Sequence, residues 1–288
     1  MVSKKILTIG AVSALAMVAT VADARHQWRQ YAWAWDGIPL DVVIYNNTSG
    51  DWVSRVGVAS SDWNVSDSIN GSVSNGNNPN CDFVTGQIDV CNDDYGSVGW
   101  LGLASIQING NEIVAGWSKM NDYYFNQQRY NNDVWRQLVM CQEIGHNYGL
   151  GHQNENFRSN TTDSCMEYTS TPTEIDKTPD QHDYDQLEAM YPTSGGGGDD
   201  SGDGGGGNGG GKDKPRGKPA SLPSLGKTPD SWGRPIDYLP NGKPYMYERE
   251  LNGYRVITHV TWTIEAAAEQ GDHHHGGGPR QHSGDLHF

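Results

Sequence analysis

Residues 141–152 read CQEIGHNYGLGH, and the spacing of three side chains in this stretch suits a metal site. Residues four apart lie on one face of a helix, about a turn from each other, so Gln142 and His146 can reach one ion. Gly149 can end the helix in a left-handed conformation, which turns the chain and lets His152 approach the same ion from another direction. The stretch therefore predicts a metal centre built on a helix and on the loop that follows it.

Glu143 is expected to lie beside this metal. A metal ion lowers the pKa of water toward neutrality, so a neighbouring carboxylate can take a proton from that water as a general base. A helix is expected to lead into the motif, because Asp133 can cap a run in which apolar residues recur at helical spacing. The pattern is thus typical of hydrolytic metal chemistry.

The pattern Q-E-x-x-H-x-x-G-x-x-H resembles the zinc signature of metzincin proteases, with Gln142 in the place of the first histidine. Further along, residues 164–168 read SCMEY and resemble the Met-turn of that clan. The resemblance implies that Met166 lies beneath the metal and that Tyr168 can stabilise an oxyanion. It covers roughly residues 28–191, is specific only at these two motifs, and is closest overall to matrixin-like domains.

The resemblance implies an α+β zincin fold, a twisted mixed sheet with an active-site helix and a small C-terminal subdomain. It also implies a secreted zinc endopeptidase that hydrolyses a protein or peptide substrate and acts as a monomer. The alternative function is an inactive protein of the same fold, a pseudoprotease that binds partners outside the cell.

Gln142 leaves three interpretations open, because a neutral amide oxygen is a harder and weaker ligand for zinc than imidazole. Gln142 could bind the metal through its oxygen, together with His146 and His152. Glu143 could instead become a ligand with His146, since residues three apart also share a helix face. In the third interpretation no metal binds stably. If Gln142 is a ligand, Gln142→His should strengthen zinc binding.

Hydrophobic periodicity places further elements along the chain. We expect a first strand within 28–35, strands at 40–45, 84–90, 100–108 and 113–117, and a helical stripe over 52–63. A last helix of this part, capped by Asp180, would carry Leu187, Met190 and Tyr191. This order is similar to that of a metzincin catalytic domain.

The N-terminus predicts export. Lys4 and Lys5 precede an apolar run over 6–21, and Ala22-Asp23-Ala24 offers a small-x-small cleavage site, so residues 1–24 read as a cleaved signal peptide. No other stretch approaches the ~20 apolar residues of a membrane span. We therefore expect a secreted, extracellular protein that has no membrane contact after cleavage.

Four cysteines in an exported chain are expected to pair, and three pairings are possible. We favour Cys81 with Cys91, which closes a short loop between extended segments. We favour Cys141 with Cys165, which ties the motif helix to the Met-turn. Each bridge could stabilise the fold by roughly 3 kcal/mol.

The formal charge of −15 argues against nucleic acid and anionic membrane surfaces as partners. Loops rich in Asn and Asp at 75–80 and 92–94 could hold structural calcium in addition to the zinc of the motif. Turn formation explains the same composition.

Composition divides the chain into a signal peptide (1–24), a catalytic domain (25–194), a Gly-rich flexible linker (195–220) and a C-terminal region (221–288). Asn252-Gly253 lies between two β-rich runs and is a good hairpin signal. The C-terminal region is either a small β module or a mostly disordered tail.

Overall fold

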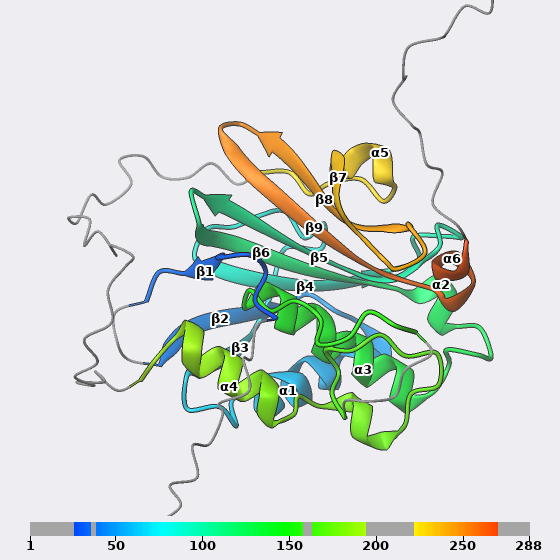
Figure 1. Ribbon diagram of the computed structural model, residues 1–288, viewed down its shortest axis with the longest axis horizontal. Helices are drawn as coiled ribbons and strands as arrows, with labels where there is room; N and C mark the ends of the chain where they lie inside the picture. Colours follow the sequence, from blue (N-terminus) through cyan, green and yellow to red (C-terminus); the bar gives the residue numbers. More distant parts are fainter. Residues whose placement is uncertain (1–25, 36–38, 158–162, 194–221, 270–288) are drawn as a thin grey trace, which may run out of the picture.

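The computed structural model describes residues 26–35, 39–157, 163–193 and 222–269 (Figure 1). The expected signal peptide, the expected linker at 195–220 and the end of the C-terminal region lie outside the described residues, so the domain boundaries stay a prediction. Within the described residues, no helix combines the length and the apolar character needed to cross a membrane.

A mixed sheet organises the described part of the chain, in the strand order β3-β2-β4-β6-β5-β9-β8-β7, with β1 paired beside β6. Pairing among β3, β2, β4 and β6 is parallel, whereas β5, β9, β8 and β7 join antiparallel. The α+β class with a twisted mixed sheet is thus confirmed. The strands are β1 (Ala32–Trp33), β2 (Leu40–Asn46), β3 (Ile69–Asn75), β4 (Gln87–Asp93), β5 (Trp100–Asn109), β6 (Glu112–Asn121), β7 (Arg234–Tyr238), β8 (Pro244–Leu251) and β9 (Tyr254–Trp262).

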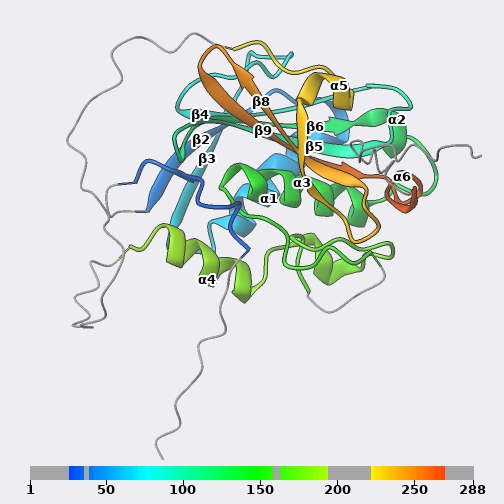
Figure 2. The same cartoon turned by 45° about the horizontal axis from the view of Figure 1, so that its top comes forward.

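Three helices lie on one side of the sheet, and α3 packs against β5 and β6 (Figures 1 and 2). These three are α1, α3 and α4. The α-helices are α1 (Val53–Trp63), α2 (Asp122–Phe125), α3 (Asp133–Asn147), α4 (Gln181–Met190), α5 (Pro229–Trp232) and α6 (Ile264–Ala268), with 3-10 turns at Gly50–Trp52 and Glu174–Lys177.

Most expected elements are present. The strands expected at 40–45, 84–90, 100–108 and 113–117 correspond to β2, β4, β5 and β6, and the helical stripe corresponds to α1. Asp180 caps α4, as expected. The strand β3 was not expected. The strand expected within 28–35 is reduced to the two residues of β1, and Trp28, Tyr31 and Trp33 pack into the core while Trp35 is exposed.

Helix α3 is buried along most of its length. Its cap is Asn132, whose side chain accepts a hydrogen bond from the Trp135 backbone amide at 3.0 Å, so the expected cap Asp133 lies in the first turn instead. The helix ends at Asn147, and Gly149 follows with a φ of 96°. A Cβ at Gly149 would lie 2.6 Å from the Tyr31 carbonyl oxygen, so the left-handed turn expected there also needs the small residue.

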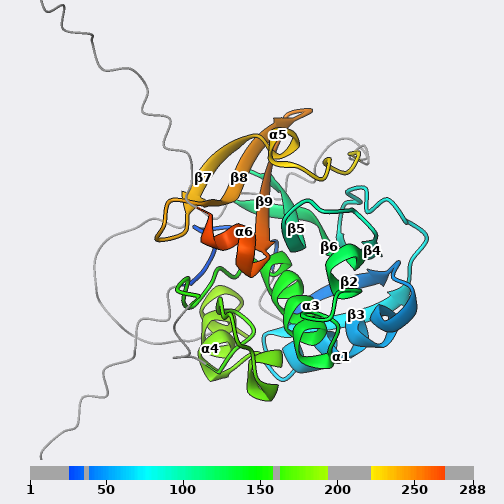
Figure 3. The same ribbon diagram turned by 90° about the vertical axis from the view of Figure 1, so that its right-hand side faces the viewer.

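The C-terminal region contributes the three strands β9, β8 and β7 at one end of the sheet (Figure 3). The β8–β9 hairpin turns at Asn252-Gly253, where φ is 51° and 85°, as the two-residue turn signal predicts. Strand β9 pairs antiparallel with β5, and its apolar residues join the same hydrophobic core as α3. Residues far from the motif in sequence thereby reach the motif helix.

Both expected disulfides are present, Cys81–Cys91 and Cys141–Cys165. The first joins Cys81, in the segment before β4, to Cys91 on β4. The second ties α3 to the turn that carries Met166. The favoured pairing is therefore confirmed.

Candidate metal centre

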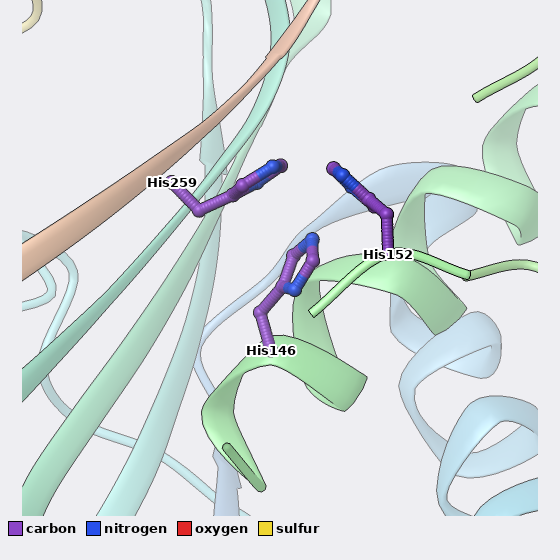
Figure 4. A group of neighbouring side chains, drawn as sticks. All are labelled: His146, His152 and His259. Carbon is purple, nitrogen blue, oxygen red and sulfur yellow. The ribbon is translucent and has the colours of Figure 1, made fainter. Parts of the chain in front are cut away.

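Three histidines converge between strand β9 and helix α3 (Figure 4). His146 lies on α3, His152 on the loop that follows, and His259 on β9, and one ligand atom from each lies within 4.8 Å of the others. The ring centroid of His146 is 3.8 Å from that of His259 and 4.9 Å from that of His152. Among the described residues this is the one group of three or more His, Cys, Asp or Glu side chains able to hold a metal ion.

The ring of His146 is fixed from two sides. Its Nδ1 lies 2.8 Å from the Leu150 carbonyl oxygen, which can only accept, so Nδ1 carries the hydrogen and Nε2 keeps a free lone pair. Trp28 stacks on the same ring at 5.0 Å, with an angle of 5° between the planes. The tautomer and orientation therefore suit a metal ligand.

Burial keeps all three rings neutral. It lowers the pKa of His146 to about 3 and holds the pKa values of His152 and His259 well below their usual range. Within the described residues, His146 Nε2, both ring nitrogens of His152 and His259 Nδ1 have no hydrogen-bond partner. Buried unpaired nitrogens are costly, and neutral imidazoles are good zinc ligands, so this donor set fits a zinc ion.

Glu143 lies beside the imidazoles, with Oε2 3.9 Å from His259 Nδ1. The side chain is fully buried, and this burial raises its pKa to about 8. The nearby Thr261 hydroxyl opposes the shift only in part. Gly102 on β5 makes room for Glu143, because a Cβ there would clash with its carboxylate. The arrangement places a carboxyl group that titrates near neutral pH next to the cluster.

Gln142 is also buried, but its amide serves other partners. Its Nε2 donates to the carbonyl oxygens of Cys165 and Glu167, at 2.8 and 3.2 Å. Its Oε1 accepts from the Thr261 hydroxyl at 2.8 Å. The oxygen that was expected to bind the metal is therefore engaged with β9, and the third imidazole of the cluster is His259.

Met166 and Tyr168 lie in the turn below α3. A Cβ on Gly145 would lie 2.6 Å from Met166 Sδ, so the methionine packs directly against the helix turn that carries His146. The ring centroid of Tyr168 is 4.1 Å from that of His152. The Tyr168 hydroxyl donates to the Val260 carbonyl oxygen at 2.9 Å and lies 3.3 Å from His259 Nε2. In this arrangement the hydroxyl contacts β9.

His259 is the site residue that sequence reasoning missed. The Asn252-Gly253 turn predicts a strand after it, and residues 256–262 read VITHVTW. A histidine within a buried apolar strand is a signal of its own, because a polar ring at 0% exposure needs a partner. Which partner it meets depends on the pairing of β9 with β5, and no local pattern specifies that pairing.

A pocket of about 530 Å³ lies near the cluster, between the loop after His152 and the C-terminal region. Glu155 and Phe157 line one side, and Leu239, Ile264 and Ala267 line the other. Glu155 accepts a hydrogen bond from the Tyr245 hydroxyl. The Tyr245 ring centroid lies 5.7 Å from that of His152, so Tyr245 links the pocket residue Glu155 to the imidazole cluster.

The loops expected to hold calcium form hydrogen bonds with neighbouring segments. In loop 75–80 the Asn78 backbone amide donates to Asn47 Oδ1 at 2.6 Å, and in loop 92–94 Asn92 Nδ2 donates to Asp122 at 2.6 Å. Calcium stays a prediction.

Comparison with known proteins gives little. No protein-family model matches the sequence, and no curated protein matches it. Among solved structures, the chain is similar to the structure of myroilysin, with 14% identity and a TM-score of 0.35, over 58% of this chain and 98% of that one.

Proposed function

We propose that this chain is a secreted zinc-dependent endopeptidase that acts on a protein or peptide substrate. One observation carries the proposal: Glu143, a buried carboxyl group, lies beside three neutral imidazoles whose ring nitrogens are available as ligands. Three protein ligands that leave a coordination position open, with an acid–base group next to them, are typical of catalytic zinc sites.

His146, His152 and His259 would hold the zinc. A bound zinc ion supplies Lewis acidity, which polarises a substrate carbonyl and lowers the pKa of water. Imidazole suits zinc better than calcium or magnesium, which prefer oxygen ligands. The cluster therefore supports zinc over the harder ions.

Glu143 would accept the proton of the attacking water at Oε2 and later deliver it to the leaving amine. Its pKa of about 8 supports this exchange, because a general base works best when its pKa lies near the working pH. A zinc ion close to Glu143 would lower that raised pKa toward its usual value and favour the ionised base.

The substrate would approach from the pocket beside Glu155 and Tyr245. The edge of β5 is already paired with β9, so a substrate strand cannot pair with β5 there. Tyr168 is the expected oxyanion stabiliser. For that role its hydroxyl has to leave the Val260 carbonyl, to which it now donates. Tyr168→Phe should therefore affect turnover more than zinc binding.

The complete burial of Glu143, His146 and His259 favours a second candidate function. In that case the zinc is structural, and the chain is a catalytically inactive extracellular binding protein of the same fold. Structural zinc sites are closed to solvent, whereas catalytic sites keep one position open. Hydrolysis separates the two candidates.

Glu143→Gln tests the proposal, because it keeps the shape of the side chain and removes the proton acceptor. Zinc stoichiometry should stay at the wild-type value, while hydrolysis of a diverse peptide library should fall by ~10²-fold or more. Both quantities are measured on the full-length secreted protein, by metal analysis and by mass spectrometry of the cleaved peptides.

Two other results would contradict the proposal. Wild-type protein that holds zinc but cleaves no peptide, with the variant indistinguishable from it, would establish the structural-zinc function. Loss of zinc in Glu143→Gln would identify Glu143 as a ligand and remove the general base from the mechanism.

A further inference from the structure

We infer that Gln142 is a positioning residue: it fixes β9 against α3 so that His259 completes the imidazole cluster. This inference rests on the proposed zinc site. It assigns a role to the residue that departs from the histidine pattern, and it predicts how the site responds when the pattern is restored.

The amide of Gln142 connects three parts of the chain. Its nitrogen donates to the carbonyls of Cys165 and Glu167 in the turn below α3, and its oxygen accepts from Thr261 on β9. An amide has two N–H donors and an acceptor oxygen on one short side chain, which matches this set of partners. A carboxylate would face two carbonyl oxygens, and an imidazole lacks the second N–H on one atom.

Thr261 and His259 lie two residues apart on β9, so their side chains lie on the same face of the sheet. Both face α3, where Thr261 meets Gln142 and His259 meets His146. Because a one-residue shift of a strand would turn its side chains to the other face, the Gln142–Thr261 hydrogen bond selects the pairing that delivers His259.

The backbone pairing of β5 with β9 specifies the register less strictly near Thr261. The register between β5 and β9 shifts between Trp100 and Gly102, and Gly102 lies opposite Thr261. A side-chain hydrogen bond from α3 to Thr261 adds a restraint where the ladder is irregular. Both groups are buried, so losing one partner would leave the other unsatisfied.

Glutamine in place of histidine at position 142 and histidine at position 259 therefore depend on each other, because Gln142 holds the strand that carries His259. Histidine in place of Gln142 could not make all three hydrogen bonds, because a neutral imidazole has one N–H donor where the turn accepts two bonds from the amide nitrogen. We expect Gln142→His to weaken zinc binding, which is the opposite of the result expected if Gln142 were a ligand.

The deciding test uses Thr261, which touches Gln142 and is not a proposed ligand. Thr261→Val keeps the shape of the side chain and removes the hydroxyl, whereas Thr261→Ser keeps the hydroxyl. Removing a hydrogen bond that orients a metal ligand typically lowers metal affinity about 10- to 100-fold. We expect that loss for Thr261→Val and for Gln142→His, and near wild-type affinity for Thr261→Ser.

Thr258→Val is the matched control. Thr258 lies on the same strand, is equally buried, and bonds to Ser105 at 2.6 Å on the opposite face of the sheet. It should leave the zinc affinity within about twofold of wild type, even if it lowers stability by about as much as Thr261→Val.

Two readouts are taken on the full-length protein: the zinc dissociation constant by competition with a chelator, and the visible spectrum of the cobalt-substituted protein. The cobalt spectrum reports the geometry of the ligands, so it should change in Thr261→Val and stay unchanged in Thr258→Val. Near-ultraviolet circular dichroism checks that each variant is folded.

Zinc binding by Gln142→His that equals or exceeds that of the wild type would overturn the inference, as would a Thr261→Val variant that matches Thr258→Val in both readouts. If Gln142→His does not fold, the Thr261 and Thr258 variants decide. Wild-type protein that binds zinc without cleaving peptides would end the peptidase proposal and leave this inference standing. Wild-type protein that binds no zinc would end both.

Discussion

The two parts of the candidate metal centre differ in how the chain specifies them. His146 and His152 lie on α3 and on the loop after it, where helix spacing and the turn at Gly149 bring them together. His259 comes from β9, and only the pairing of β9 with β5 and the contact with Gln142 place it there. One part is local in sequence, and the other depends on the sheet.

This difference explains why a motif can be informative and still incomplete. The local part keeps its geometry through backbone conformation, such as the left-handed Gly149. The distant part keeps its geometry through packing, because β9 lies in the core beside α3. The third imidazole can therefore come from the distant part in place of position 142 in the local part, because Gln142 at that position bonds to β9.

The largest expected effect compares a ligand from each part. His259→Gln and His146→Gln should each lower zinc affinity by more than ~10²-fold, because changes to residues that merely orient a ligand already cost about 10- to 100-fold. Chelator competition measures both constants. A His259→Gln variant that keeps wild-type affinity would show that the local part is sufficient.

The disulfides give the next largest effect. Replacing Cys141 and Cys165 by Ser should lower the free energy of unfolding by about 3 kcal/mol and also weaken zinc binding, since the bridge ties α3 to the Met166 turn. Replacing Cys81 and Cys91 should lower stability by a similar amount and leave zinc affinity unchanged. Denaturant unfolding and zinc titration distinguish the two. Equal zinc affinities in the two variants would contradict the tie between this bridge and the site.

The pH dependence of metal-free protein separates the general base from the imidazoles. Glu143 has its pKa raised from 4.5 to about 8, so the folded state binds the extra proton and stability falls as pH rises from 4.5 to 8. His146 has its pKa lowered from 6.5 to about 3, so stability falls as pH drops below 6.5. His152 and His259 act in the same direction as His146.

Below pH 6.5 the loss of stability from the three imidazoles is larger than the gain from the one carboxyl group. Above pH 6.5, of these four groups only Glu143 changes the stability. Melting temperatures in chelator should therefore be highest near pH 6.5. Glu143→Gln should remove the decline toward pH 8, and His259→Gln should make the decline on the acid side shallower. Melting curves that do not change in either variant would mean that these groups are solvated in the metal-free protein.

The smallest expected effect lies outside both parts, at the start of α3. Asp133 accepts from Arg55 and Lys177 at 2.8 and 2.9 Å, and these bonds lower its pKa, but its side chain is 61% exposed. Asp133→Asn should lower the free energy of unfolding by less than about 1 kcal/mol, with no change in zinc binding. A larger loss in denaturant unfolding would mean that this pair of ion pairs holds α3 in place.

Sequence reasoning reached the elements whose signals are local. Helical periodicity gave α1 and α3, alternation gave β4, β5 and β6, and the Asn252-Gly253 pair gave the β8–β9 hairpin. It did not predict β3, because the polar sequence INGSVSN has no strand pattern of its own. Parallel pairing with β2 stabilises this strand. Nor did it place the C-terminal strands in the same sheet as the motif.

The amino-acid sequence by itself determined the motif helix, the turn at Gly149 and the acidic neighbour Glu143, because each depends on spacing within a short stretch. It favoured the two disulfides among three possible pairings, and the structure selects them. Only the tertiary structure decided that Gln142 bonds to Thr261 and that His259 is the third imidazole. Strand order and register come from packing over the whole core, and the same local sequence is compatible with many of them.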